Sequence, residues 1–318
     1  DKAGRFSARA TILAEQFKFA ADWPEAQNAK LFTNFNGPGF TAIGTASFLG
    51  NPIELKTSGI ESFAKSDLKV NVHSSSKMQT LLPVLKSTPL KNTVGDLVVG
   101  LQGNGVVETD VQMFFPLSKE PEQNQIAGNI RFNKTDIKSP ALNLAMQQVI
   151  GEAKFDNDGF SGNQLQAKMD NNPVVFGIRV GPNHVLNQAN QVEANVKGDF
   201  NTDYLLKFDP SLSDLGTVLK GKSPWLFTVQ VPISKNNAPA PVFLKAQSNL
   251  VGTELNLPIP LNKALLQSKA FELNTQLPSD QGSIEFKIGQ EFRLLLNKPV
   301  NKPMSGIALF GIGTQGSI

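Results

Sequence analysis

Apolar and polar residues alternate along much of this sequence. Residues 174–180 and 225–233 carry Val, Phe, Ile or Trp at every second position, and residues 284–296 show the same spacing. Shorter alternating runs cover residues 68–72 and 107–115. Successive side chains of a strand point to opposite faces, so this pattern predicts strands with one apolar and one polar face. Such strands suit an antiparallel sheet that is wetted on one side.

Helical spacing of apolar residues is confined to three short segments. They cover residues 76–86, 142–150 and 211–220, and a proline or a glycine follows each of them. Proline and glycine commonly end helices, so each segment predicts one short helix. The expected fold is therefore mainly β, with antiparallel strands and a few short helices.

Two stretches of the chain resemble each other. Residues 29–55 and 151–176 each contain a Gly-Phe pair and, later, an Asn-Pro pair, both of which are typical of turns. Each copy predicts a three-stranded meander. The repetition predicts one continuous, repeat-built segment over residues 1–318. Its approximate internal units are 1–127, 128–221 and 222–318.

Several loops and turns are expected between these strands. Residues 118–125 and 234–241 are polar, contain proline, and predict surface hairpin loops. The glycine-rich residues 100–105 superficially resemble a phosphate-binding loop. An alternating strand follows them rather than a helix, so a hairpin turn is expected. Residues 249–263, NLVGTELNLPIPLNK, predict a strand that turns at glycine into an extended segment, because two prolines exclude a helix.

Composition excludes several classes of partner and site. The 318 residues carry a formal net charge of +3 and have no Lys/Arg-rich run, which argues against nucleic acid as a partner. The absence of cysteine excludes disulfides and thiolate sites, but leaves the compartment open. No run of 18 apolar residues occurs. The chain begins at Asp1, and we interpret it as a piece of a longer protein whose anchor or signal lies elsewhere.

Catalytic and metal-binding motifs are not evident. The chain has no cysteine and its carboxylates are scattered, so His73 and His184 are both expected to be ordinary surface histidines. The acidic segment 155–160, FDNDGF, lacks the downstream glutamate of a calcium loop and predicts a turn. No GxSxG motif accompanies the serines. We therefore expect no enzyme activity, no metal and no cofactor.

The apolar sheet face needs a cover, because such a face must be buried. The predicted helices are too few to supply it. That leaves a sandwich-like closure, a barrel, or a groove whose missing layer is lipid. A transmembrane barrel would need two aromatic girdles, which one Tyr and two Trp among 22 Phe do not provide.

Short motifs in a fixed order carry a resemblance to a known family. They are DWP (22–24), LLP (81–83), STPL (87–90), FPL (115–117), GNIRF (128–132), GEAKF (151–155), NP (172–173), SPW (223–225), SNLVG (248–252), LNLP (255–258) and PLNK (260–263). Together they cover nearly the whole chain. In this order they resemble the AsmA-like proteins of the Gram-negative envelope, and specifically their YhdP branch.

The resemblance implies an elongated, twisted antiparallel sheet that curls into an open hydrophobic groove. It also implies a periplasmic segment of an inner-membrane-anchored protein that delivers phospholipid to the outer membrane. Phospholipids and the two membrane surfaces would then be the partners, and no catalytic motif is carried over. A structural or protein-binding β-scaffold of the cell envelope is the alternative.

A set of alternating apolar residues is expected to line this groove. The set is Leu165, Ala167, Met169, Val174, Phe176, Ile178, Trp225, Phe227, Val229, Val231, Ile284, Phe286, Ile288, Phe292 and Leu294. The extended proline segment after Gly252 is expected at the groove margin, where Pro258 and Pro260 would block edge pairing.

Overall fold

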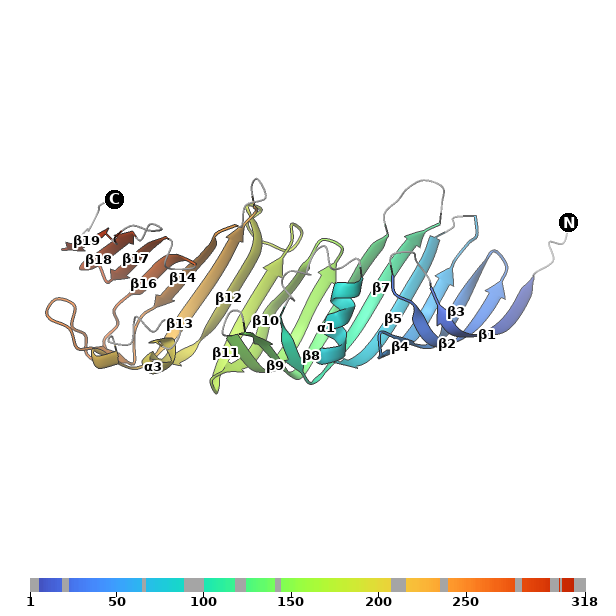
Figure 1. The fold of residues 1–318 in the computed structure, drawn as a ribbon, viewed down its shortest axis with the longest axis horizontal. Helices are drawn as coiled ribbons and strands as arrows, with labels where there is room; N and C mark the ends of the chain where they lie inside the picture. The colour runs from blue at the N-terminus through green and yellow to red at the C-terminus, as the bar shows by residue number, and fades with distance from the viewer. Residues whose placement is uncertain are drawn as a thin grey trace. The chain divides into compact units, whose positions relative to one another are not determined.

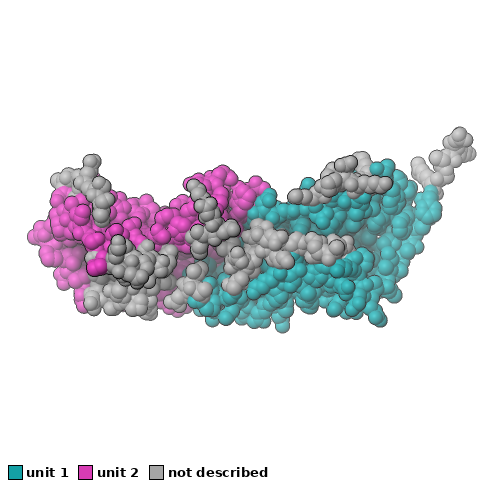
Figure 2. All heavy atoms as spheres, turned by 45° about the horizontal axis from the view of Figure 1, so that its top comes forward, with its two compact units in different colours: residues 1–163 teal, residues 164–318 magenta. Residues whose placement is uncertain are grey.

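The protein is mainly β, as the alternating pattern predicts. The computed structural model describes residues 6–18, 23–64, 67–88, 100–117, 124–140, 144–206, 216–234, 240–277, 282–297, 303 and 305–311. Within these residues the chain forms strands β1 to β19 and helices α1 and α3 (Figure 1). It divides into two compact units, residues 1–163 (unit 1) and 164–318 (unit 2), which Figure 2 colours separately. The three internal units expected from the repetition stay a prediction.

In its described residues, unit 1 is an antiparallel array of long strands with the helix α1. Its elements are β1 (Ser7–Phe17), β2 (Ala26–Asn36), β3 (Gly39–Phe48), β4 (Asn51–Ile60), β5 (Asp67–Lys77), α1 (Met78–Ser87), β6 (Gln102–Asn104), β7 (Val106–Pro116), β8 (Gln125–Ser139) and β9 (Leu144–Asp156). Each long strand pairs with the next in chain order. The short β6 pairs with β8 beyond the end of β7.

Unit 2 continues in the same style. Strand β10 (Phe160–Met169) contains the division between the units and precedes β11 (Asn172–Val180), β12 (Asn190–Asn201), α3 (Thr202–Leu206), β13 (Leu219–Pro232), β14 (Val242–Ser248), β15 (Thr253–Leu255), β16 (Phe271–Leu277), β17 (Ser283–Ile288), β18 (Phe292–Asn297) and β19 (Ser305–Phe310). From β11 the long strands pair successively and antiparallel, with β14 followed directly by β16. The short β15 pairs with the first residues of β13.

The repeated Asn-Pro pairs begin strands rather than occupying the turns. The turn residues are 49–50 in unit 1 and 170–171 in unit 2. Asn51 Nδ2 donates to the carbonyls of the residues three and two positions earlier, at 3.2 and 3.3 Å. Asn172 Nδ2 makes the equivalent bonds at 3.4 and 3.1 Å. Both asparagines are buried, so the repeated residue closes the same turn in each unit.

One predicted helix is confirmed and a second is wrong. The helix expected over residues 76–86 is α1. Residues 144–150, expected in a helix, belong to strand β9. Met146 and Val149 are both buried although they stand three residues apart, and Gln148 between them has φ 53°. The ladder to β8 also shifts register in this region, so a β-bulge produced the apparent helical spacing.

The third predicted helix falls partly outside the described residues. Residues 211–215 are not described, whereas Leu219 and Lys220 begin strand β13, so the expected helix end is wrong. A short helix instead follows β12 as α3. The packing of Phe200 against Tyr204, with ring centroids 5.6 Å apart, holds this helix next to the strand end.

The hairpin turn expected at residues 100–105 is also wrong. Gln102–Asn104 form β6, the chain bends at Gly105, and β7 continues in the same direction, because both strands pair with β8. Gly105 has φ 104°, and its carbonyl accepts from Met78 N at 2.9 Å. The glycine therefore permits a bend within a strand rather than a reversal.

The proline segment after Gly252 folds back instead of running extended. The predicted turn at this glycine is confirmed, because Thr253 N donates to Leu250 O at 3.0 Å. Beyond β15, however, Leu261 N donates to Pro258 O at 2.8 Å and closes a tight turn. Lys263 then pairs with Leu255 through two backbone bonds of 3.0 Å. The expectation of an extended segment that blocks edge pairing is therefore wrong for these residues.

A buried lysine explains how this loop is folded. Lys263 is 2% exposed, and its Nζ donates to the carbonyls of Thr253 at 2.5 Å and Ala264 at 2.9 Å. Burial lowers the pKa of this ammonium group. The loop closes around the ammonium because a buried polar group needs partners.

Candidate functional site

The predicted groove residues of unit 2 lie on one face of its strands. Across an antiparallel pair, partner residues point to the same side. The register places Phe176 opposite Val196, which is opposite Phe227, and this row continues through Ala246, Leu273, Phe286, Leu294 and Ala308. The adjacent residues at every second position join the same face: Val174, Ile178, Trp225, Val229, Val231, Ile284, Ile288 and Phe292. We call this surface the apolar face of unit 2.

Leu165, Ala167 and Met169 belong to the same surface. They are buried positions of β10, at every second residue. Only residues 170 and 171 separate β10 from β11, so a two-residue turn brings these side chains to the side of Val174 and Phe176. All the groove residues predicted from the sequence therefore share one face.

Burial divides this face into two parts. Leu165, Met169, Val174 and Phe176, on β10 and β11, are 3–7% exposed. From β13 to β18 the predicted residues are only half-buried, including Phe227 and Phe286. Large apolar side chains thus remain partly uncovered by the polypeptide over several neighbouring strands.

Aromatic rings form a connected row on the half-buried part. Trp225 stacks on Phe227 with ring centroids 5.8 Å apart, and Phe271 meets Trp225 edge-on at 5.3 Å. Phe286 contacts Phe271 at 6.3 Å, and Phe200 contacts Phe227 at 5.7 Å. These pairs are within the range of favourable ring contacts. The row gives the face a connected aromatic surface that crosses several strands.

Several residues of this face were missed from the sequence. They are Val192, Ala194, Val196 and Phe200 on β12, Leu244 and Ala246 on β14, and Phe271 and Leu273 on β16. Alternation is present in these strands, but small residues and hydroxyls interrupt the apolar series. The missed residues are recognised as part of this face only from their register with the more regular neighbouring strands.

Unit 1 has an apolar face of its own. The row Ile12, Leu31, Gly44, Leu55, Val72, Val111, Gly128 and Phe155 follows the registers from β1 to β9. Two clusters of buried side chains lie on it, one around Trp23, Phe48 and Met113 and one around Val107 and helix α1. Figure 2 shows the surface of unit 1 hollowed between two rims. None of these residues was in the predicted set.

The opposite face of unit 2 carries a charge network. Lys245 Nζ lies 3.0 Å from Glu272 Oε2, and Arg293 Nε lies 2.7 Å from Glu285 Oε1. Asn274 Nδ2 donates to both carboxylates, at 2.9 and 3.1 Å. The bond from Asn274, followed by that from Lys245, lowers the pKa of Glu272 to about 2. This face is therefore built for water and for cross-strand ion pairs.

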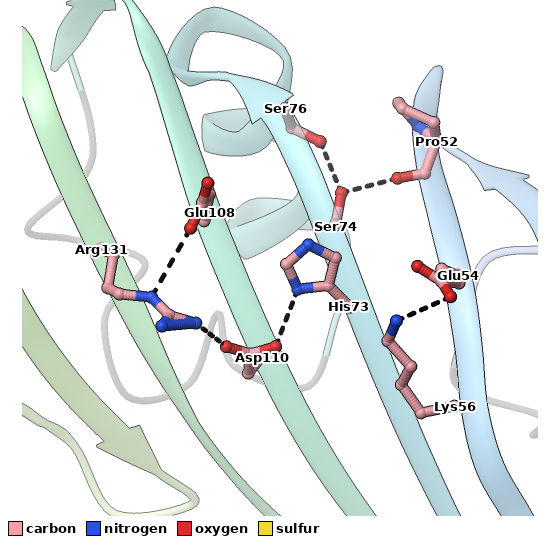
Figure 3. Close-up of polar contacts among 9 residues, drawn as sticks. All are labelled: Pro52, Glu54, Lys56, His73, Ser74, Ser76, Glu108, Asp110 and Arg131. Carbon is pink, nitrogen blue, oxygen red and sulfur yellow. Dashed lines mark hydrogen bonds and ion pairs between the residues drawn. The ribbon is translucent and has the colours of Figure 1, made fainter.

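The opposite face of unit 1 carries a similar network, drawn in Figure 3. His73 Nδ1 lies 2.8 Å from Asp110 Oδ1, and Arg131 pairs with the other oxygen of Asp110. The hydrogen bonds from His73 and Arg131 lower the pKa of Asp110. His73 was expected to be an ordinary surface histidine, whereas it is a half-buried member of this network. The adjacent Ser74 points to the apolar face, where its Oγ donates to Pro52 O at 2.7 Å.

Other candidate sites give no chemical centre. Asp156 Oδ1 accepts from the backbone N of Asp158 and of Gly159, at 2.8 and 3.1 Å, which confirms the predicted turn. A cavity of about 430 Å³ lies at β1 to β4, and Thr11, Phe32 and Ile43 place it on the side of unit 1 opposite the row that contains Ile12 and Leu31. In the described part of the chain, no three His, Asp or Glu side chains gather as metal ligands would. The helices described there are too short or too polar to cross a bilayer.

Comparison with known proteins gives one family and one curated relative. The family model described as YhdP protein matches residues 1–304. The Escherichia coli (strain K12) protein named intermembrane phospholipid transporter YhdP is 23% identical over 263 residues, which cover 82% of this chain. The chain spans about 20% of the length of that relative. No solved structure matches.

Proposed function

This chain belongs to the YhdP family, and from this premise we propose that it is a non-enzymatic segment of a phospholipid conduit. Acyl chains would lie against the apolar faces of units 1 and 2, and headgroups would stay in water. The segment would work in the periplasm as part of an inner-membrane-anchored protein that carries phospholipid between the inner and outer membranes. The name of the curated relative, an intermembrane phospholipid transporter, supports phospholipid as the ligand and transport between two membranes.

One observation carries the proposal. The row from Phe176 to Ala308 is apolar across successive strands, and from β13 onward its large side chains are only half-buried. The row one residue away contains Thr228, Lys245, Asn274 and Glu285. A sheet with one apolar and one charged face needs a cover on the apolar side, and a hydrocarbon chain can supply that cover.

Magnitudes favour this arrangement. Exposing a 16-carbon acyl chain to water costs about 12 kcal/mol, at about 0.8 kcal/mol per CH₂. A continuous apolar face removes much of that cost without any polar clamp for the headgroup. Eight successive strands at about 4.8 Å spacing give each unit a face about 35 Å long. That length is close to the roughly 30 Å hydrocarbon core of a bilayer, which two acyl chains fill end to end.

Site-specific photo-crosslinking tests the proposal. A benzophenone amino acid would replace Phe176 or Phe227 on the apolar face during expression in bacteria, and adducts would be identified by mass spectrometry. The matched controls are Val175 and Thr228, which are adjacent in sequence but point to the opposite side. We expect phospholipid adducts at the first pair and few at the second. Equal yields at the four positions, or adducts with protein alone, would contradict the conduit and favour a protein-binding scaffold.

A further inference from the structure

Helix α1 occupies part of the apolar face of unit 1. Met78 and Leu82 are buried against Val107 of β7, and Ile130 and Phe132 of β8 pack on the same cluster. In Figure 1 the helix lies across the strands near β7 and β8. The same three sheet residues alternate with the polar positions Glu108 and Arg131 and so belong to the apolar face. The helix therefore covers surface that would otherwise be open to a ligand.

Helix α1 also contacts the second cluster of this face. Val84 packs against the group that contains Trp23, Phe48 and Met113. Asn51 Nδ2 donates to Thr80 O at 3.0 Å, and Thr80 Oγ1 donates to Asn51 Oδ1 at 2.6 Å. These two bonds fasten the helix to the turn between β3 and β4. The helix thus bridges two parts of the apolar face and is also held to it by hydrogen bonds.

On its own this helix is weak. It has ten residues, no side-chain hydrogen bond at its N-cap residue Lys77, and Pro83 in its interior. Isolated helices of this length are marginal in water, and an interior proline removes a backbone hydrogen bond. The helical state of α1 therefore depends on its packing against the sheet.

We propose that α1 is a displaceable lid that competes with acyl chains for the apolar face of unit 1. This inference rests on the proposed function. A hydrocarbon chain on Val107, Ile130 and Phe132 removes the surface that supports the helix, so lid and guest exclude each other. When the lid is displaced, the acyl chain packs on the strands in the place that Leu82 occupied. The lid keeps the face covered when no lipid is bound.

Two substitutions with opposite expected effects test the lid. Leu82→Ala weakens its packing against Val107 without altering the sheet. Pro83→Ala, at an exposed position, strengthens the helix because the missing backbone hydrogen bond is restored. Gln79→Ala, at another exposed position of α1, is the matched control. All variants carry Trp225→Phe, so that Trp23 beside the lid is the single tryptophan.

The measurement is quenching of Trp23 fluorescence by vesicles of phosphatidylcholine with a dibrominated acyl chain. We expect the lipid concentration at half-maximal quenching to fall about tenfold in the Leu82→Ala variant and to rise about tenfold in the Pro83→Ala variant, since each 1.4 kcal/mol changes an equilibrium tenfold. Gln79→Ala should leave it within about twofold. Quenching that is equal in the three variants, or that is reduced by both Leu82→Ala and Pro83→Ala, would contradict the proposal of a lid. Neither result would contradict the proposed conduit.

The same titration separates failure of the lid from failure of the conduit. Absence of quenching in every variant, together with absence of phospholipid in the protein purified without detergent, contradicts the proposed function and the lid with it. Should Leu82→Ala fail to fold, Pro83→Ala alone decides, because it is expected to stabilise the helix. Unchanged or stronger quenching in the Pro83→Ala variant then overturns the lid.

Discussion

Lys245 Nζ lies 3.0 Å from Glu272 Oε2 on the neighbouring strand, and this ion pair is part of the polar face of unit 2. The pKa of Glu272 is lowered from 4.5 to about 2 by Asn274 and Lys245. A carboxylate whose pKa is lowered in the folded state contributes its full stabilisation at pH values above its pKa in the unfolded state. That contribution is lost as the pH falls from about 4.5 toward 2. The shift sets an upper bound of about 3 kcal/mol, which solvent screening reduces to about 1–2 kcal/mol.

We therefore expect Glu272→Gln to lower the free energy of unfolding of unit 2 by about 1–2 kcal/mol at pH 7 and to leave it almost unchanged at pH 2. Urea denaturation in a Trp23→Phe background, followed by the fluorescence of Trp225, measures the change. Glu61→Gln, at an exposed position of unit 1, is the control. An equal loss at both pH values would show that the charge of Glu272 is not responsible.

A carboxylate on the apolar face should reduce lipid loading. Val229 points to the apolar face of unit 2, and Gln230 points to the other side. In the Val229→Asp variant an acyl chain would have to cover a charged group, which is unfavourable without a partner. We expect at least about a fivefold loss of phospholipid that copurifies with the chain, and little loss in the Gln230→Asp variant. Equal lipid content in both variants would argue against this face as the binding surface.

Substitutions at two glycines of unit 1 should distinguish the stability cost of backbone strain from that of steric crowding. Gly59 has φ 143°, and a Cβ added to it would lie 2.0 Å from Phe40 O. Gly37 has φ 69°, but nothing lies within 4 Å of such a Cβ. Gly37→Ala should cost about 1 kcal/mol, from strain alone. Gly59→Ala should cost at least about 2 kcal/mol, because adjacent strands must move apart. Urea unfolding in the Trp225→Phe background, monitored by Trp23, compares them, and equal losses would contradict the crowding.

The buried ammonium of Lys263 should be essential to the loop that follows β15. Lys263→Met removes the donor that serves the carbonyls of Thr253 and Ala264. Buried acceptors without partners are costly, so we expect a loss of about 2–4 kcal/mol in the unfolding of unit 2. The exposed Lys220→Met is the control. Unchanged stability, with no new proteolytic cleavage at residues 256–268, would show that the ammonium is dispensable.

Where alternation is regular, the period-two pattern was enough to predict the strand and the face to which its residues belong. Phe227 and Val229 needed no structural information, because their neighbours Thr228 and Gln230 are polar and mark the parity of the strand. The pattern became ambiguous at the bulge beside Gln148, where one extra residue turned an alternating series into an apparent helix. The local spacing of apolar residues indicates a strand or a helix, but it does not show where a β-bulge interrupts the strand.

Long-range contacts were the part that the sequence did not reveal. Lys263 reads as a surface lysine, and only the return of the chain after Pro258 surrounds it with carbonyl groups. His73 likewise becomes half-buried through Asp110, which lies 37 positions later in the sequence. Leu81 and Leu82 predicted a helix correctly, yet nothing nearby in the sequence indicated that this helix would lie on Val107. Such contacts depend on strand register, which motifs alone do not encode.

The two sides of each strand are under unequal chemical demands. The proposed hydrocarbon guest would have no fixed outline, so Val, Leu, Ile and Phe should be nearly interchangeable on the side of Phe227, provided that the parity is kept. On the side of Lys245 and Glu272, each substitution must be matched by a partner on the next strand. Substitutions should therefore accumulate freely on one side and in matched pairs on the other, which is compatible with an identity of only 23% to the relative described above.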